Sequence, residues 1–272
     1  MRKIRARKMR INMRKNIFTG TVGRTLAETR YQYKVVDTNP ENAPNVIYIV
    51  LDDMGFAQLG CYGSTISTPN IDRLAYEGLR YNNFHTTAVC SATRCSLLTG
   101  ANHHAVGCAN LIEMRTGAPN NPNGELKPEY ALISEILKEY GYATFACGKW
   151  HLSASQGAAG PVDGWPVQRG FDRYYGFLHG ENDQYHPHLI RDNTAVKQPK
   201  TVKEGYHFSE DIVDNAIDYL FEHNMNFPKQ PFFLYLAFGA MHTPHHAPKE
   251  YIDAYKGKFD AGWDVTRQLW FE

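Results

Sequence analysis

The 272-residue chain has the composition of a globular protein, with 43% hydrophobic residues, 21% charged residues and a net charge of +1. This composition excludes a wholly disordered chain, and the length suffices for one large domain or two small ones. The longest apolar runs, Val46–Leu51 and Phe232–Phe238, are much shorter than the roughly 20 residues that a membrane-spanning helix needs, so we expect no membrane span.

Positive charge is concentrated in the first part of the chain, where residues 1–34 hold eleven Lys or Arg and one acid, Glu28. Subtraction from the totals of 29 and 28 leaves 18 basic and 27 acidic side chains elsewhere. We therefore predict a basic arm and lead-in over residues 1–45. Such a tail can bind nucleic acid or anionic lipid, but we interpret it as a solvated tail or the product of a misplaced start codon and expect no nucleic-acid partner.

The arm lacks the apolar stretch of a secretory signal. We therefore expect a cytoplasmic protein, or a periplasmic one if the true start differs. The cysteine count also favours a reducing compartment, because five is an odd number and no CxxC pair is present. This pattern argues against a disulfide framework and against a structural zinc site. The cysteines are Cys61, Cys90, Cys95, Cys108 and Cys147.

Strand and helix patterns alternate beyond the arm. Short β-branched apolar runs predict strands, and apolar residues at helical spacing with capping signals predict helices. The predicted elements are, in chain order, a strand over 46–51, helices over 68–78 and from just after Cys90, a helix over 130–140, a strand over 143–147, a helix over 210–223 and a strand over 232–238. This alternation predicts an α/β fold with a mostly parallel sheet sandwiched by helices. Long loops over 101–128 and 152–208 are of a length that is often functional.

Polar side chains follow each of the three predicted strands. Asp52 and Asp53 follow the first strand, Gly148–His151 the second, and His242 the third. Because the carboxyl ends of parallel strands meet at one edge of a sheet, we expect these residues to form a site there. Adjacent carboxylates suit a hard cation such as calcium or magnesium, although an isolated Asp-Asp pair is more often a solvated turn.

Cys90 is predicted at the N terminus of a helix, with Arg94 one helical turn later. The helix dipole and the guanidinium would both lower the thiol pKa and attract an anion, whereas the alternative is a buried structural cysteine. The stretch Cys90–Gly100, with small residues, Arg94 and a Leu-Thr-Gly ending, resembles the signature of the type I, formylglycine-dependent sulfatases.

Two further stretches resemble the same family. Gly141–His151 resembles its second signature, in which Lys149 and His151 lie two residues apart and would point to one side of an extended segment. Gly239–His245 resembles the family's His-x-Pro-His turn and contains His242. Three signatures that occur in the family's order, close to predicted strand ends, identify the family more specifically than any one of them alone.

The resemblance is closest to the large bacterial arylsulfatases and extends from about residue 20 to the end of the sequence. It implies an alkaline-phosphatase-like sulfatase fold, in which residues 46–272 form the N-terminal portion of the catalytic domain, before the last strands and the C-terminal domain. The implied protein is a sulfuric ester hydrolase acting on a small-molecule sulfate ester.

The resemblance also implies a role for each site residue. Cys90 is converted to Cα-formylglycine, whose hydrate attacks sulfur. Asp52, Asp53 and the residue-90 oxygen hold Ca²⁺, with Mg²⁺ as the alternative cation. Arg94 and Lys149 stabilise the nucleophile and the sulfate oxygens. His151 orients or deprotonates the hydrate, and His242 protonates the leaving group.

Two departures from the family pattern qualify these expectations. Ala92 stands where proline is commoner, which implies a radical-type maturase as the partner that forms formylglycine. No residue matches the family's downstream Asp-Asn metal ligands or its later lysine, so we expect little hydrolysis by this chain alone. The alternatives are a formylglycine-dependent phosphonate or phosphodiester hydrolase and an inactive sulfatase-like fragment that binds anions.

Overall fold

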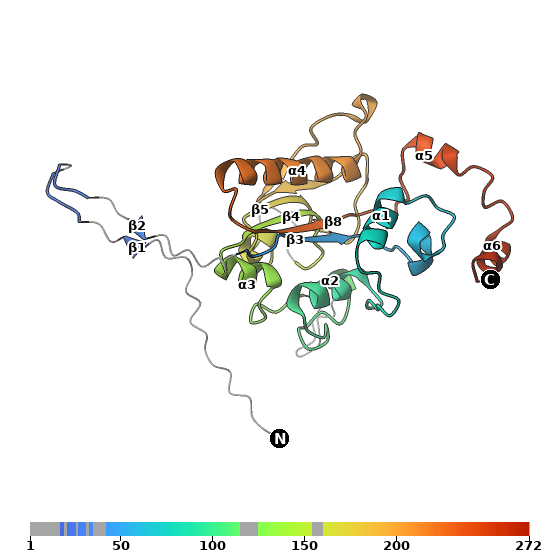
Figure 1. The fold of residues 1–272 in the computed structure, drawn as a ribbon, viewed down its shortest axis with the longest axis horizontal. Helices are drawn as coiled ribbons and strands as arrows, with labels where there is room; N and C mark the ends of the chain where they lie inside the picture. The colour runs from blue at the N-terminus through green and yellow to red at the C-terminus, as the bar shows by residue number, and fades with distance from the viewer. Residues whose placement is uncertain are drawn as a thin grey trace, which may run out of the picture.

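The fold is built around a six-stranded sheet with helices on both faces, as Figure 1 shows for the described residues. The computed structural model describes residues 17–18, 21–25, 27–30, 33–34, 42–114, 125–153 and 160–271. Its helices are α1 (Pro69–Glu77), α2 (Cys90–Thr99), α3 (Ile133–Glu139), α4 (Phe208–Asn226), α5 (Lys249–Ala254) and α6 (Trp263–Phe271). Its strands are β1 (Ile17–Phe18), β2 (Tyr33–Lys34), β3 (Val46–Val50), β4 (Ala143–Lys149), β5 (Arg173–Phe177), β6 (Leu189–Arg191), β7 (Thr194–Val196) and β8 (Phe232–Ala237).

The sheet has the strand order β3-β8-β4-β5-β6-β7. The first four strands in this order are parallel to one another, and β6 and β7 are added in antiparallel orientation at one edge. In the central register, Phe145 of β4 lies opposite Leu234 of β8 and Arg173 of β5. The prediction of a mostly parallel α/β sheet is therefore confirmed.

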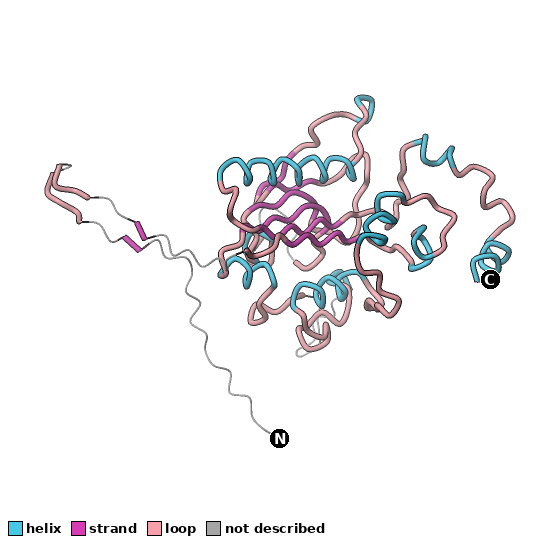
Figure 2. The backbone as a smooth tube through the Cα atoms, in the orientation of Figure 1, coloured by secondary structure: helices cyan, strands magenta, loops and turns pink. Residues whose placement is uncertain are grey.

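The two faces of the sheet are covered by different helices (Figures 1 and 2). On one face, Ile212, Ala216 and Tyr219 of α4 pack in a core that includes Phe145 and Leu234. On the other face, a core that extends to α2 contains Cys95, Leu98, Trp150, Phe171 and Phe233. The central strands β4 and β8 are buried on both faces, which explains why they read as continuous apolar runs and not as an alternating pattern.

The predicted strands and helices beyond the arm are confirmed, with shifts of a few residues at their ends. One prediction was wrong: the long loop over 152–208 contains β5, β6 and β7. These strands are short, and Gly176 interrupts β5, so they lack the apolar runs that mark β3 and β8. A second difference is that β4 continues to Lys149, which therefore lies within the strand and not after it.

The N-terminal arm contains the short strands β1 and β2, which pair in antiparallel orientation apart from the main sheet (Figure 1). Residues 1–16 of the predicted arm lie outside the described residues. In the part of the chain that the structure describes, no helix combines the length and apolarity needed to cross a membrane.

Gly176 is required by a close approach between neighbouring strands. A Cβ atom at this position would collide with the carbonyl oxygen of Gly148 and lie 2.7 Å from its carbonyl carbon. Because the colliding atoms belong to the backbone of β4, they cannot move aside as a side chain could.

We expect Gly176→Ala to lower the free energy of unfolding by about 3 kcal/mol, the upper part of the usual overpacking range. Denaturant unfolding of the purified protein measures this loss. Gly55→Ala is the control, because its Cβ would meet only the Gln58 side chain, at 3.4 Å, and should change stability by no more than about 0.5 kcal/mol. Equal losses in both variants would contradict the backbone collision as the cause.

Candidate active site

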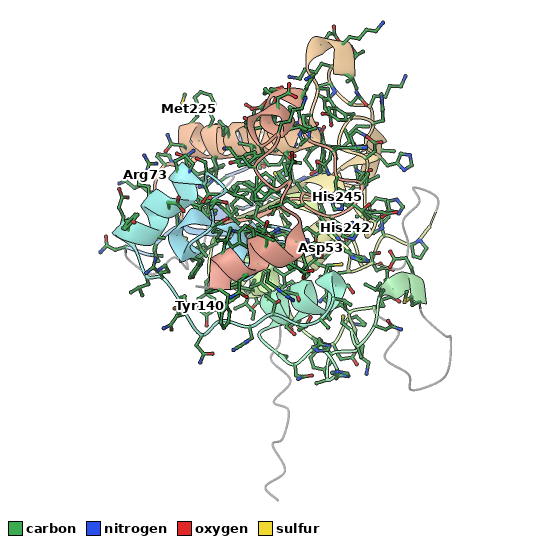
Figure 3. All side chains as sticks on the ribbon, turned by 90° about the vertical axis from the view of Figure 1, so that its right-hand side faces the viewer. Asp53, Arg73, Tyr140, Met225, His242 and His245 are labelled. Carbon is green, nitrogen blue, oxygen red and sulfur yellow. The ribbon has the colours of Figure 1, made fainter. Side chains whose placement is uncertain are left out.

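The carboxyl ends of β3, β8 and β4 bring the predicted site residues to one edge of the sheet. Asp52 follows β3, and its backbone is bonded to the segment after β8: its N–H donates to the Ala240 carbonyl (3.0 Å), and its own carbonyl accepts from the Met241 N–H (2.6 Å). Figure 3 shows Asp53 and His242 together on this side of the molecule. The expected convergence of the three strand ends is observed.

A buried carboxylate joins three elements at this edge. Asp52 Oδ2 lies 2.6 Å from Lys149 Nζ at the end of β4, and Asp52 Oδ1 lies 3.1 Å from Arg94 Nη2 in α2. The three side chains are at most 3% exposed. Because two cations surround one anion, the cluster carries a net positive charge and favours a further anion beside it.

Arg94 makes additional hydrogen bonds that fix its direction. Its Nη1 donates to the Lys149 carbonyl and to the hydroxyl of Tyr235, both at 3.1 Å. Burial raises the pKa of Tyr235, so this phenol stays neutral and accepts the hydrogen bond. In the described part of the chain, Arg94 Nε and the Ser91 hydroxyl are buried without a hydrogen-bond partner. Arg94 thus retains donor capacity that a ligand could use.

Cys90 begins α2, as predicted, and faces a histidine. Its Sγ lies 3.2 Å from Nδ1 of His151, and Nε2 of the same ring lies 3.0 Å from a carboxylate oxygen of Glu113. Burial is the main cause that lowers the pKa of His151, and Lys149 and Arg94 lower it further, whereas Glu113 raises it. At neutral pH the ring is therefore neutral, with one nitrogen free to accept a proton.

The direction of His151 is set by its own left-handed backbone conformation and not by an extended strand. We expected Lys149 and His151 to share one side of an extended segment, but β4 ends at Lys149 and His151 has a φ of 56°. This left-handed conformation is costly for a residue other than glycine, and it persists because the surroundings impose it. Both side chains nevertheless reach the site, Lys149 toward Asp52 and His151 toward Cys90.

Asp53 and His242 form a more open pair beside this cluster. His242 Nε2 lies 3.7 Å from Asp53 Oδ2, and His242 Nδ1 lies 4.0 Å from a carboxylate oxygen of Glu181. The side chain of Asp53 is 58% exposed and that of His242 is 21% exposed. The pair is thus accessible to a molecule that enters from solvent.

The residues fit a hard cation in kind but supply only part of its ligands. Asp52 and Asp53 offer carboxylate oxygens, which calcium and magnesium prefer, but Asp52 is bonded to two cationic side chains. Among the described residues no group of three or more His, Cys, Asp or Glu could hold a metal. Because calcium takes about six to eight oxygens, Asp52 and Asp53 account for a minority of a complete site.

Sequence reasoning missed Glu113, Tyr235 and Glu181. Tyr235 carried a usable signal, because a tyrosine hydroxyl inside a buried strand must find a partner. Glu113 lies in the long loop over 101–128 that we predicted to be functional, but nothing in its neighbours pointed to His151. Glu181 likewise follows β5, a strand that was not predicted.

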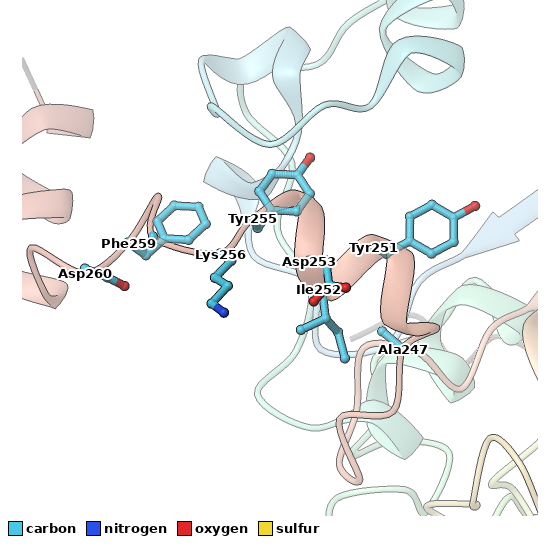
Figure 4. A pocket seen from close by; sticks show the side chains of 9 residues that line it. Ala247, Tyr251, Ile252, Asp253, Tyr255, Lys256, Phe259 and Asp260 are labelled. Atoms are coloured by element: carbon cyan, nitrogen blue, oxygen red, sulfur yellow. The ribbon is translucent and has the colours of Figure 1, made fainter.

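The site does not coincide with a hollow on the surface beside α5. That hollow measures about 760 Å³ and lies along α5 and the segment after it (Figure 4). It is lined by Ala247, Tyr251, Ile252, Asp253, Tyr255, Lys256, Gly257, Phe259 and Asp260, none of which is a predicted site residue. The candidate active site is therefore identified by its converging chemistry and not by the size of a cavity.

We expect Asp52→Asn to lower the free energy of unfolding by about 3–5 kcal/mol, because it leaves two buried cations without their counter-charge. Denaturant unfolding measures this loss. Asp53→Asn is a matched control, because the Asp53 carboxylate is exposed and asparagine tolerates the φ of 55° that residue 53 adopts. A control that loses as much stability as Asp52→Asn would refute the buried ion pairs as the cause.

Comparison with known proteins places this chain in a family. The sulfatase family model matches residues 44–269. An uncharacterized sulfatase of Schizosaccharomyces pombe (strain 972 / ATCC 24843) is 37% identical over 249 residues, covering 83% of this chain and 42% of that protein. The arylsulfatase of Klebsiella aerogenes is 29% identical over 242 residues, covering 84% of this chain and 49% of that protein.

A solved structure agrees with these sequence relatives. The structure of Ps i-CgsB in complex with k-i-k-neocarrahexaose superposes with a TM-score of 0.61 at 30% identity, covering 78% of this chain and 48% of that chain. The chain thus spans less than half of the length of each of these three relatives. Since the family model covers most of the sequence and includes every predicted site residue, the chain belongs to the sulfatase family.

Proposed function

We propose that this protein hydrolyses sulfate esters through a formylglycine formed from Cys90. The observation that carries the proposal is the position of Cys90: it begins α2, its Sγ lies 3.2 Å from a neutral histidine, and the buried cations Arg94 and Lys149 flank the same edge of the sheet. The hydrate of a formylglycine supplies the oxygen that attacks sulfur.

Arg94 and Lys149 bind and orient the sulfate group. Both are buried, and the single charge of Asp52 leaves one positive charge in excess, so an anion is attracted to the cluster. The unpartnered Nε of Arg94 adds a donor for a sulfate oxygen. Charge developing on these oxygens is stabilised by groups already in place, because Asp52 and Tyr235 hold the guanidinium.

The two histidines transfer different protons, His151 at the attacking residue 90 and His242 at the leaving group. His151 accepts a proton at Nδ1 from the residue-90 group, because that nitrogen faces Cys90 and the ring is neutral. We assign to His242 the donation of a proton to the leaving alkoxide or phenoxide, a role that its partial exposure to solvent supports.

A divalent cation completes the proposed site. Asp52, Asp53 and the residue-90 oxygen are the proposed ligands for Ca²⁺, with Mg²⁺ as the alternative, and the cation supplies positive charge for the sulfate oxygens. Asp52, which is paired with Arg94 and Lys149, would share its carboxylate between these side chains and the cation.

The proposed substrate is a small-molecule sulfate ester, with aryl sulfates the first to test. The Klebsiella relative is named an arylsulfatase, and Ps i-CgsB was solved in complex with k-i-k-neocarrahexaose. We place residues 46–272 in the N-terminal portion of the catalytic domain. A formylglycine-generating maturase is the proposed protein partner.

We expect the tryptic peptide of residues 81–94, which ends at Arg94, to contain formylglycine when the chain is expressed with a competent maturase. Its mass falls by the difference between a thiol and an aldehyde group, and it reacts with a hydrazide. Cys90→Ala removes both signals. An unmodified Cys90 under every maturation condition would contradict the proposed nucleophile.

We expect the protein expressed from its complete reading frame to release sulfate from 4-nitrophenyl sulfate in the presence of calcium, and Cys90→Ala to lower kcat by at least about 1,000-fold. Cys61→Ala is the matched control, because Cys61 is a free cysteine outside the candidate site. Faster hydrolysis of a nitrophenyl phosphodiester than of the sulfate would instead assign the protein to phosphoester chemistry.

We propose that Ala92 determines which maturase acts on the chain, and proline at its position would remove no helical hydrogen bond. The first backbone hydrogen bond of α2 runs from the Thr93 N–H to the Val89 carbonyl, so the Ala92 N–H precedes the helical ladder and its loss costs little. We expect Cys90 of the native chain, with Ala92 in place, to be converted by the radical-type maturase, and Ala92→Pro to make Cys90 a substrate of the oxygen-dependent type as well. The mass of the peptide that contains Cys90 measures both, and conversion of Cys90 in the native chain by the oxygen-dependent type alone would contradict this assignment.

A further inference from the structure

The ring nitrogen of His151 that faces away from Cys90, Nε2, contacts the carboxylate of Glu113. Glu113 belongs to none of the sulfatase-like signatures. We propose that Glu113 is a positioning residue that holds the His151 imidazole with its bare Nδ1 turned toward residue 90. The consequence for turnover rests on the proposed function, but the arrangement itself is a property of the chain with unmodified Cys90.

The hydrogen-bonding capacities of the three side chains determine the arrangement. Nε2 of His151 lies 3.0 Å from Oε2 of Glu113, and an ionised carboxylate can only accept. Nε2 must therefore carry the hydrogen. In a neutral ring the other nitrogen is then bare, and that nitrogen, Nδ1, lies 3.2 Å from Cys90 Sγ. The thiol can donate to it, and so can a hydroxyl of the formylglycine hydrate.

The backbone around His151 leaves the ring little freedom to turn. A Cβ atom on Gly180 would lie 2.9 Å from Cε1 and 3.0 Å from Nε2 of His151, and 3.5 Å from Oε1 of Glu113. The His151 N–H donates to the Leu178 carbonyl at 3.2 Å, and the residue has a left-handed φ of 56°. The segment after β5 thus packs directly against the His151–Glu113 pair, and only a glycine fits there.

The contact with Glu113 matters because the His151 ring is buried and has little water to hydrogen-bond with. The His151 side chain is 2% exposed, whereas that of Glu113 is 44% exposed and reaches the ring from the loop surface. When Nδ1 accepts a proton from the residue-90 hydroxyl, the O–H bond breaks, an N–H bond forms, and the ring becomes a cation with its Nε2–H still donated to Glu113. The hydrogen bond to Glu113, 3.0 Å long, thus keeps the ring in one orientation while Nδ1 gains the proton.

Histidine-selective nitrogen-15 NMR of the unmodified chain tests the arrangement without any turnover. The His151 signals are assigned by their loss in His151→Asn. We expect the native chain and Glu113→Gln, whose side-chain oxygen still accepts, to give a neutral ring with hydrogen on Nε2. Glu113→Ala should give a shifted mixture of the two neutral forms, and Glu129→Ala, at an exposed glutamate before α3, should leave the native signals. Native signals in Glu113→Ala would overturn the proposal.

Kinetics of the matured protein test the consequence. We expect Glu113→Ala to lower kcat about 100-fold, the lower end of a general base's contribution, with little change in KM. Glu113→Gln should recover part of kcat, because it restores the orientation without the charge, and Glu129→Ala should match the native protein. Equal kcat in Glu113→Ala and native protein would overturn the proposal. Failure of the native matured protein to hydrolyse any sulfate would instead refute the proposed function, while the NMR result still decides the role of Glu113.

Discussion

The buried carboxylate of Asp52 is the interaction on which the candidate site depends. It joins the ends of β3 and β4 to α2 by ion pairs with Lys149 and Arg94. A charge removed from water is tolerated only with such partners, so each of the three side chains fixes the direction of the others. The excess positive charge that results is what makes this edge of the sheet suitable for an anion.

The parallel sheet supplies the geometry that this interaction needs. Strands β3, β8 and β4 are adjacent and run in one direction, so the residues that follow them meet although they are far apart in the sequence. Backbone hydrogen bonds between Asp52 and the segment after β8 tie two of these ends together. The helix α2 then brings Cys90 to the same edge, because its packing against the sheet directs its first turn there.

The site divides into a rigid part and an accessible part. Asp52, Arg94, Lys149 and His151 are buried, and their contacts leave them little freedom. Asp53, His242 and Glu113 are exposed to different degrees and come from turns and loops. This division matches the proposed chemistry, in which the buried cations hold the sulfate, the buried His151 accepts a proton from residue 90, and the more exposed His242 serves the leaving group. The family signatures follow strands and helix starts. They therefore include Arg94, Lys149 and His151 of the buried part, but only His242 of the accessible part.

The sequence by itself determined the fold class, the main strands and helices, and the residues Cys90, Arg94, Lys149, His151 and His242 as candidates, because apolar periodicity and ordered local motifs are written in consecutive residues. Only the tertiary structure decided that β5–β7 extend the sheet, since short strands are stabilised by neighbours and not by their own composition. It likewise decided that Asp52 pairs with both cations, that His151 turns through a left-handed residue, and that Glu113 and Tyr235 complete the contacts. These contacts join residues far apart in the chain, and a local sequence pattern does not show which distant side chains the packing brings together.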